Sequence, residues 1–104
     1  MYSKFYFDSH NFSLTSFRDK LISFDFRGGT TYYFHLFSDS GKRLGSVIPF
    51  YLSNYDEKDK LIEELFFNIL NKISCLELYS DSKSFCVLVS SDLLAGFSKS
   101  HLNK

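Results

Sequence analysis

Several residue types are scarce in this chain. Its 104 residues include no tryptophan, one proline, two cysteines and five glycines. With so little proline and glycine there is little room for a flexible linker, and the length is close to the commonest size of one domain. Cys75 and Cys86 have ten residues between them rather than the two of a C-x-x-C pair, so they predict small apolar core residues. We expect one domain over residues 1–104.

An excess of charge of one sign is also missing, because twelve Lys and Arg balance twelve Asp and Glu. A binder of duplex DNA normally has a clear basic excess, since neutralising phosphates supplies much of its affinity. No run approaches the roughly 18 apolar residues of a membrane span, and the first residues lack the apolar core of a signal peptide. We expect a cytoplasmic protein with reduced thiols, no membrane contact and no cofactor.

No catalytic or metal-binding motif is found in the sequence. The three histidines, His10, His35 and His101, have no second ligand at a metal-binding spacing. Neither "RGG" nor "SGKRLG" matches a phosphate-binding glycine motif. An enzyme built on His35 or a cysteine is the weakest hypothesis, because neither group has an orienting partner nearby in the sequence. We therefore expect a protein that is not an enzyme and holds no metal.

The clearest periodic signal lies in "NYDEKDKLIEELFFNILNKIS". Its apolar residues recur every three or four positions from Leu61 to Ile73, which builds one apolar face of a helix. The segment predicts a helix over about 55–73 with its carboxylates on a solvated face. The last residues, "SDLLAGFSKSHL", predict a short terminal helix near 92–101.

Alternating apolar residues predict the strands. Strands near 21–27, 30–38 and 43–52 form an antiparallel meander, and strands 75–79 and 84–90 form a C-terminal hairpin. Even-numbered residues of the meander are the more apolar and should face the helix. Three-residue loops at 27–29 and 39–41 keep even residues opposite even residues, with Gly29 and Gly41 in the left-handed conformation. The second loop would pair Leu36 with Leu44 and Phe34 with Ser46. The result is an α+β fold with the helix packed on one face of the sheet, and residues 1–20 stay open between strand, helix and loop.

The odd-numbered residues of the meander include aromatic and basic side chains. An open sheet face normally carries polar residues, whereas exposed aromatic and arginine side chains are typical of protein interfaces and of base-stacking surfaces. Alternatively, the terminal helix or residues 1–20 cover this face as a second core layer. The candidate partner-binding residues are Tyr33, His35, Phe37, Arg43, Tyr51, Lys42 and Arg27.

Two functional hypotheses follow. The first is a small non-catalytic protein that binds another macromolecule, most simply a protein, and modulates or inhibits it. Small size without motifs is typical of immunity proteins, antitoxins and phage anti-defence proteins such as anti-CRISPR proteins. The second is a single-stranded nucleic-acid binder that stacks bases on Tyr33, Phe37 and Tyr51. The neutral net charge ranks it second. A homodimer through the odd-numbered face or an edge strand is compatible with both hypotheses.

Overall fold

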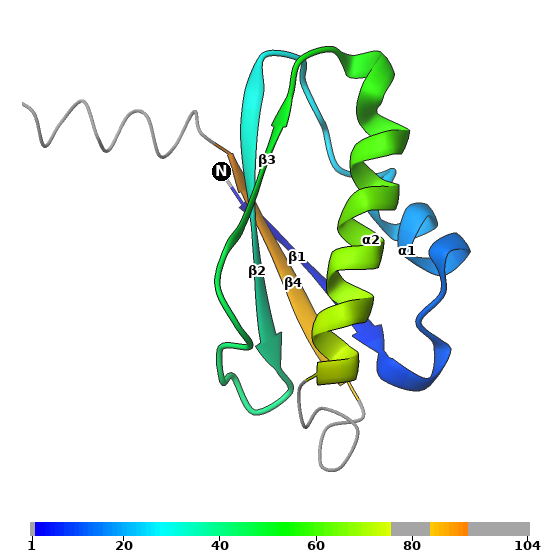
Figure 1. Ribbon diagram of the computed structural model, residues 1–104, viewed down its shortest axis with the longest axis vertical. Coiled ribbons are helices and arrows are strands. Elements are labelled where there is room, and N and C mark those ends of the chain that lie inside the picture. Colours follow the sequence, from blue (N-terminus) through cyan, green and yellow to red (C-terminus); the bar gives the residue numbers. More distant parts are fainter. Residues whose placement is uncertain (1, 76–83, 92–104) are drawn as a thin grey trace, which may run out of the picture.

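A four-stranded antiparallel sheet forms one layer of the protein and two helices form the other (Figure 1). The computed structural model describes residues 2–75 and 84–91. In chain order the elements are β1 (Tyr2–Asp8), a 3-10 turn (Ser9–Asn11), α1 (Leu14–Leu21), β2 (Thr30–Ser38), β3 (Ile48–Leu52), a second 3-10 turn (Tyr55–Glu57), α2 (Lys58–Cys75) and β4 (Ser84–Ser91). The predicted α+β class is confirmed.

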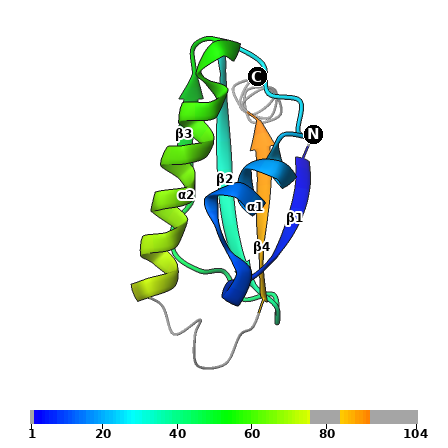
Figure 2. The same ribbon diagram turned by 90° about the vertical axis from the view of Figure 1, so that its right-hand side faces the viewer.

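Strands distant in sequence are neighbours in the sheet, whose order is β1-β4-β2-β3. Helix α1 connects β1 to β2 and α2 connects β3 to β4. In both cases the two connected strands are parallel, with one antiparallel strand between them. Both helices lie on the same face of the sheet (Figure 2). The central strands are therefore β4 and β2, and the edge strands are β1 and β3.

The predicted C-terminal hairpin is wrong. Residues 84–90 of β4 pair with β1, and residues 85–91 pair with β2, so both sides of β4 are occupied. Residue 75 ends α2 instead of beginning a strand. Residues 76–83 and the predicted terminal helix lie outside the described residues. The strand at 84–90 itself is confirmed, and its neighbours are β2 and β1, the latter about eighty residues earlier in the chain.

The predicted strand at 21–27 is also wrong. Helix α1 covers residues up to Leu21, and its N-terminus is capped by Ser13, whose side chain accepts a hydrogen bond from the Ser16 amide. The alternating residues that follow form an irregular segment. Phe26 from this segment is 1% exposed and packs edge-on against Tyr32, whose hydroxyl accepts a hydrogen bond from the Arg27 amide at 2.5 Å. Of the alternating apolar residues, Phe26 is buried and Phe24 half-buried without a strand, whereas Ile22 is exposed.

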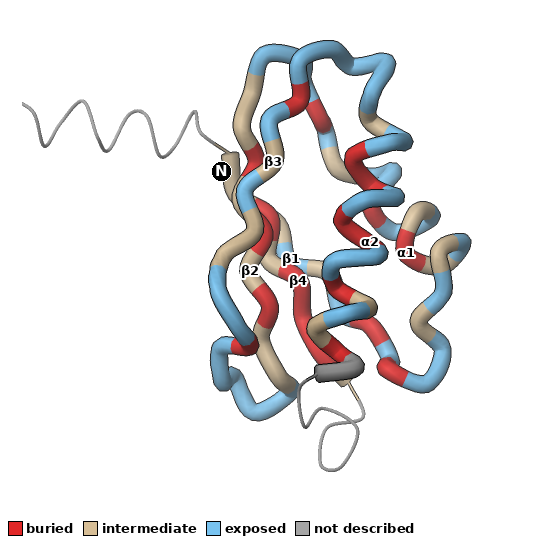
Figure 3. The backbone as a smooth tube through the Cα atoms, viewed as in Figure 1, coloured by how far each residue is buried: buried red, intermediate tan, exposed pale blue. Residues whose placement is uncertain are grey.

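The predicted main helix is confirmed as a 3-10 turn followed by the 18 residues of α2. Its apolar face is buried against the even-numbered residues of β2 and the odd-numbered residues of β4, which Figure 3 shows as the red segments between the layers. Phenylalanines from several elements fill the space beside α1, where Phe12 stacks on Phe66 at a ring-centroid distance of 4.9 Å. The buried residues of α2 are Leu61, Ile62, Leu65, Phe66, Ile69 and Ile73.

The hairpin between β2 and β3 begins as predicted and then departs from the predicted register. Gly41 has a φ of 87°, and the Leu44 amide donates to the Leu36 carbonyl at 2.8 Å. Further along, Phe34 pairs with Ile48 rather than with Ser46, so β3 is shorter than the predicted strand at 43–52. Two additional residues form a bulge around Gly45. Side chains alternate between the two faces with a period of two residues. An insertion of two residues therefore keeps the even-numbered residues of β3 on the inner face.

Candidate protein-binding sheet face

The sheet face opposite the two helices carries no other element of the described chain (Figure 1). We call it the open face. Of the predicted cover formed by residues 1–20, the described residues 2–20 do not lie over it, since β1 extends the sheet sideways and α1 packs on the inner side. Strand registers assign fourteen residues to the open face: Tyr2, Lys4, Tyr6, Asp8, Thr31, Tyr33, His35, Phe37, Pro49, Tyr51, Ser84, Cys86, Leu88 and Ser90.

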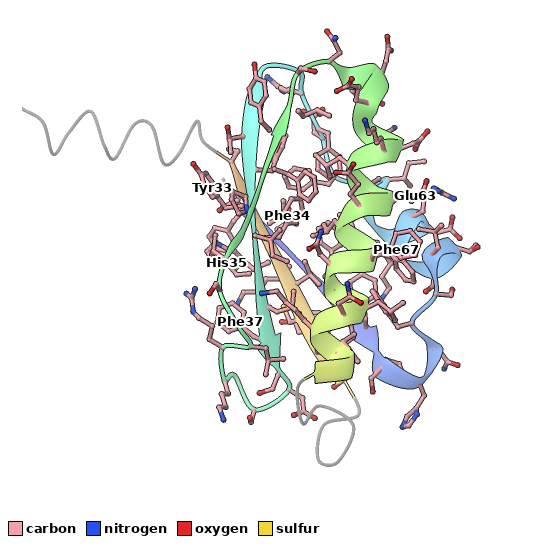
Figure 4. All side chains as sticks on the ribbon, in the orientation of Figure 1. Tyr33, Phe34, His35, Phe37, Glu63 and Phe67 are labelled. Carbon is pink, nitrogen blue, oxygen red and sulfur yellow. The ribbon has the colours of Figure 1, made fainter. Side chains whose placement is uncertain are left out.

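Three rows of paired residues cross the open face. In Figure 4 the side chains of Tyr33, His35 and Phe37 project away from α2, whereas Phe34 between them points toward it. This confirms the predicted alternation in β2. The rows are Tyr2–Ser90–Tyr33–Pro49, Lys4–Leu88–His35 and Tyr6–Cys86–Phe37–Arg43.

The tyrosines of the two edge strands, β1 and β3, are well exposed on the open face. Tyr2, Tyr6 and Tyr51 are 61%, 62% and 64% exposed. Within the described residues the close ring pairs lie elsewhere, mostly in the core, and none joins two open-face rings. Phe37 instead has the guanidinium of Arg43 5.5 Å from its ring centroid. Such a cation–π contact holds the arginine side chain in place with little loss of its hydrogen-bonding capacity.

A shallow groove of about 530 Å³ lies on the part of the open face next to the β2–β3 turn. Its lining includes Lys4, Tyr6, Phe37, Cys86 and Leu88. Burial raises the pKa of the Cys86 thiol, so the thiol is protonated at neutral pH and is a poor nucleophile. The groove combines an apolar floor with an ammonium group at its side, which suits binding better than covalent catalysis.

His35 is at the centre of the open face. Burial and, to a smaller extent, the nearby Arg43 lower the pKa of its imidazole. Its Nε2 lies 3.5 Å from the Ser90 hydroxyl. A neutral imidazole at this position can donate one hydrogen bond and accept another, and it adds no charge at neutral pH.

The structure brings four of the seven candidate residues together, places Tyr51 and Lys42 beside them, and leaves Arg27 outside the group. Tyr33, His35 and Phe37 are adjacent on β2, and Arg43 packs on Phe37. Tyr51 lies on the same face on the edge strand β3, and Lys42 is exposed in the β2–β3 turn. Arg27 lies in the loop before β2, where its Nη2 is 3.0 Å from an Asp25 carboxylate oxygen.

Sequence reasoning missed the open-face residues of β1 and β4. The segment "YSKFYFD" has the same alternation between two faces that was found in β2, with Tyr2, Lys4 and Tyr6 on one face and Phe5 and Phe7 on the other. These residues pair with β4 rather than with the predicted meander. The two strands are far apart in the chain, so a local sequence pattern does not predict that they are neighbours. The missed residues double the width of the open face and add the ammonium of Lys4 to it.

The outer side of α2 has a different character. Glu63 and Glu64 are exposed there, and Phe67 beside them is 51% exposed (Figure 4). Lys4 and Arg43 lie at the open face with Asp39 in its groove, and Glu63 and Glu64 lie on the outer side of α2.

Within residues 2–75 and 84–91, no group of three or more His, Cys, Asp or Glu side chains could hold a metal ion. No helix in the same residues has both the length and the apolar character needed to cross a membrane. Comparison of the chain with protein families, with characterised proteins and with solved structures gives no match.

Proposed function

We propose that this protein is a small non-catalytic module that binds another protein through the open face and thereby modulates or inhibits it. One observation carries the proposal. Both helices pack on the same side of the sheet, and the side that the described residues leave open carries exposed tyrosines, Phe37 and Arg43 among its polar side chains. Aromatic and arginine side chains are the residue types that contribute most to binding energy in protein interfaces.

The size of the face sets the kind of contact. Four strands about 4.8 Å apart and seven residues at about 3.4 Å each give a flat area of roughly 450 Å². A stable interface buries about 800 Å² on each partner. The sheet face alone therefore supplies about half of such an interface. A partner would also contact the rims of the face, where Lys42 and Arg43 of the turn lie on one side and β1 on the other.

The module would act by covering a functional surface of its partner. Immunity proteins, antitoxins and anti-defence proteins work in this way, and the chain shares with them its small size and its lack of a catalytic motif. The cations Lys4 and Arg43 favour a partner surface that carries carboxylates around an apolar centre, since complementary charge speeds and orients association.

Affinity capture with matched variants tests the proposal. The tagged protein is used to recover partners from lysate of its source organism, with and without nuclease. A stoichiometric, nuclease-resistant partner should be lost with Tyr33→Ala or Arg43→Ala and kept with Glu63→Ala, whose exposed side chain lies on α2. Thermal unfolding of each variant controls for loss of fold. Retention of the partner by all three variants, or recovery of no partner, would contradict the proposal.

Single-stranded nucleic acid is the second candidate, and the unpaired aromatic rings beside Lys4 and Arg43 favour it, because bases stack on such rings. Asp39 lines the same groove, which places a carboxylate where phosphates would run. This is why we rank a protein partner first. A gel shift with mixed-sequence oligonucleotides at low salt should show binding that weakens steeply as salt rises. No shift at low salt would rule out this candidate.

A further inference from the structure

We propose that the outer edge of β1 is a second binding site, which accepts an extended acidic segment of a partner protein as a fifth strand of the sheet. This site uses main-chain groups at the side of the sheet and is distinct from the open face. A sheet edge offers a row of unpaired N–H and C=O groups, and strand addition to such an edge is a common mode of peptide recognition.

The two edges of the sheet differ. β3 has five residues and contains Pro49, which has no N–H to donate. β1 has seven residues without proline, and no strand of the described chain pairs with its outer side. Short strands and prolines are the usual protection of an edge against strand addition. β3 has this protection and β1 lacks it.

Two observations show which residues of β1 turn their main-chain groups outward. Lys20 Nζ, from α1, donates to the Tyr6 carbonyl oxygen. On β2, the main-chain groups of Leu36 and Ser38 bond to Leu44 and Lys42, so those of Phe37 face its partner Cys86 on β4. In an antiparallel strand the N–H and C=O of one residue point to the same side, and the side alternates along the strand. Cys86 therefore turns away from β1, and the outward groups of β1 are those of Tyr2, Lys4, Tyr6 and Asp8.

The charges beside this edge indicate an acidic occupant. Lys4 projects onto the open face next to the edge, and Lys20 approaches the edge from the helix side. The Asp8 carboxylate, which accepts hydrogen bonds from the His10 amide and from Asn11 Nδ2, lies at the end of this edge, so two cationic side chains and one carboxylate lie beside it. An incoming strand with acidic side chains could pair with both lysines, and its own N–H could replace Lys20 on the Tyr6 carbonyl.

The same lysines disfavour a second copy of this chain on the edge. Pairing of β1 with β1 of another copy would bring two Lys4 and two Lys20 side chains into one short ladder, where like charges are destabilising. Tyr2 and Tyr6, exposed on either side of Lys4, would give apolar side chains of a foreign strand a surface to cover. The edge thus favours an acidic partner over self-association.

Amide hydrogen exchange measured by NMR on the unsubstituted protein tests the proposal. The probe is a terminally blocked octapeptide of alternating glutamate and valine, added at about 1 mM, the range of weak peptide binding. Exchange at the outward amides Tyr2, Lys4 and Tyr6 should slow by about tenfold. The inward amides of Phe5 and Phe7 should not change. Equal protection by an octapeptide of alternating lysine and valine, or no protection, would overturn the proposal.

Substitutions at Lys4 distinguish the contribution of its charge from that of its main-chain N–H. Lys4→Glu should weaken binding of the labelled Glu–Val peptide about tenfold in fluorescence anisotropy, which corresponds to about 1.4 kcal/mol. Lys60→Glu, an equal charge change at an exposed position of α2, should leave it unchanged. Lys4→Pro removes one outward N–H and should abolish binding. If that variant does not fold, the exchange pattern of the unsubstituted protein and the Lys4→Glu comparison still decide.

Two further outcomes bear on the alternatives. Slow exchange at the outward amides that depends on protein concentration without peptide would mean that a second copy occupies the edge, and it would overturn the proposal. Tyr33→Ala lies two strands away and should leave peptide protection intact. A failure at the edge therefore does not count against the open-face proposal, which is tested by Tyr33→Ala and Arg43→Ala.

Discussion

Replacing Gly45 by alanine should destabilise the fold more than the same change at Gly41. Both glycines have a positive φ, 76° at Gly45 and 87° at Gly41. A left-handed conformation costs a non-glycine residue about 1–2 kcal/mol. The loss of chain freedom in the unfolded state returns about 0.4–1 kcal/mol of this cost. Nothing lies within 4 Å of a Cβ at Gly41. We therefore expect Gly41→Ala to lower the free energy of unfolding by about 1 kcal/mol.

Gly45 has an additional constraint from α2. A Cβ there would be 2.8 Å from Lys72 Nζ, which donates a hydrogen bond of 2.9 Å to the Ser46 carbonyl. The ammonium is the end of a flexible side chain and can move away, but it then loses this bond. A hydrogen bond of this kind contributes about 0.5–1.5 kcal/mol. The expected cost of Gly45→Ala is therefore about 2 kcal/mol, the sum of the backbone and hydrogen-bond contributions.

Urea denaturation followed by far-UV circular dichroism measures both costs, since the chain has no tryptophan for fluorescence. A double-mutant cycle with Lys72→Met isolates the contact. In that background Gly45→Ala should cost no more than Gly41→Ala, with a coupling energy of about 0.5–1 kcal/mol in the cycle. Equal costs for the two glycine substitutions with Lys72 present would refute the proposed role of Lys72.

Two other predictions concern His35 and the two faces of the sheet. Because the fold lowers the pKa of His35, the unfolded chain takes up the proton first, and this group should destabilise the fold as pH falls below about 6.5. His35→Gln should reduce the difference between urea midpoints at pH 7.5 and pH 5.5, and an unchanged difference would contradict this. Phe34→Ala, at a fully buried position between the layers, should cost about 3–5 kcal/mol. Tyr51→Ala should cost within about 0.5 kcal/mol because the side chain is 64% exposed, and similar melting temperatures for these two variants would contradict the assignment of faces.

The elements that could be predicted are those whose signal is local. α2 has five turns of apolar periodicity, and β2 alternates over nine residues. α1 has eight residues, several with weak helix propensity such as Thr15 and Phe17, and depends on a Ser13–Ser16 capping box and on tertiary packing. The pairing of β4 with β1 depends on side-chain fit between segments far apart in the chain. Local patterns contain no information on it.

The candidate site was predicted in part for the same reason. Tyr33, His35 and Phe37 follow from parity within one strand, and Arg43 follows from a turn whose glycine indicates its geometry. Lys4 and Tyr6 became part of the face only through the long-range pairing of β1. The predicted neighbours of β2 on its other side were wrong, yet the face was correctly assigned, because parity depends only on which side of β2 is buried.

Parity also explains how the irregular bulge at Gly45 leaves the open face intact. A single extra residue between Leu44 and Ile48 would reverse every later side chain of β3, moving Tyr51 inward and Phe50 outward. Two extra residues change the register and preserve the side. The left-handed Gly45 and the Lys72 ammonium on the Ser46 carbonyl allow the chain to hold this two-residue excess. A contact from α2 on the inner layer thus maintains the arrangement of aromatic residues on the opposite face, although Lys72 does not itself lie on that face.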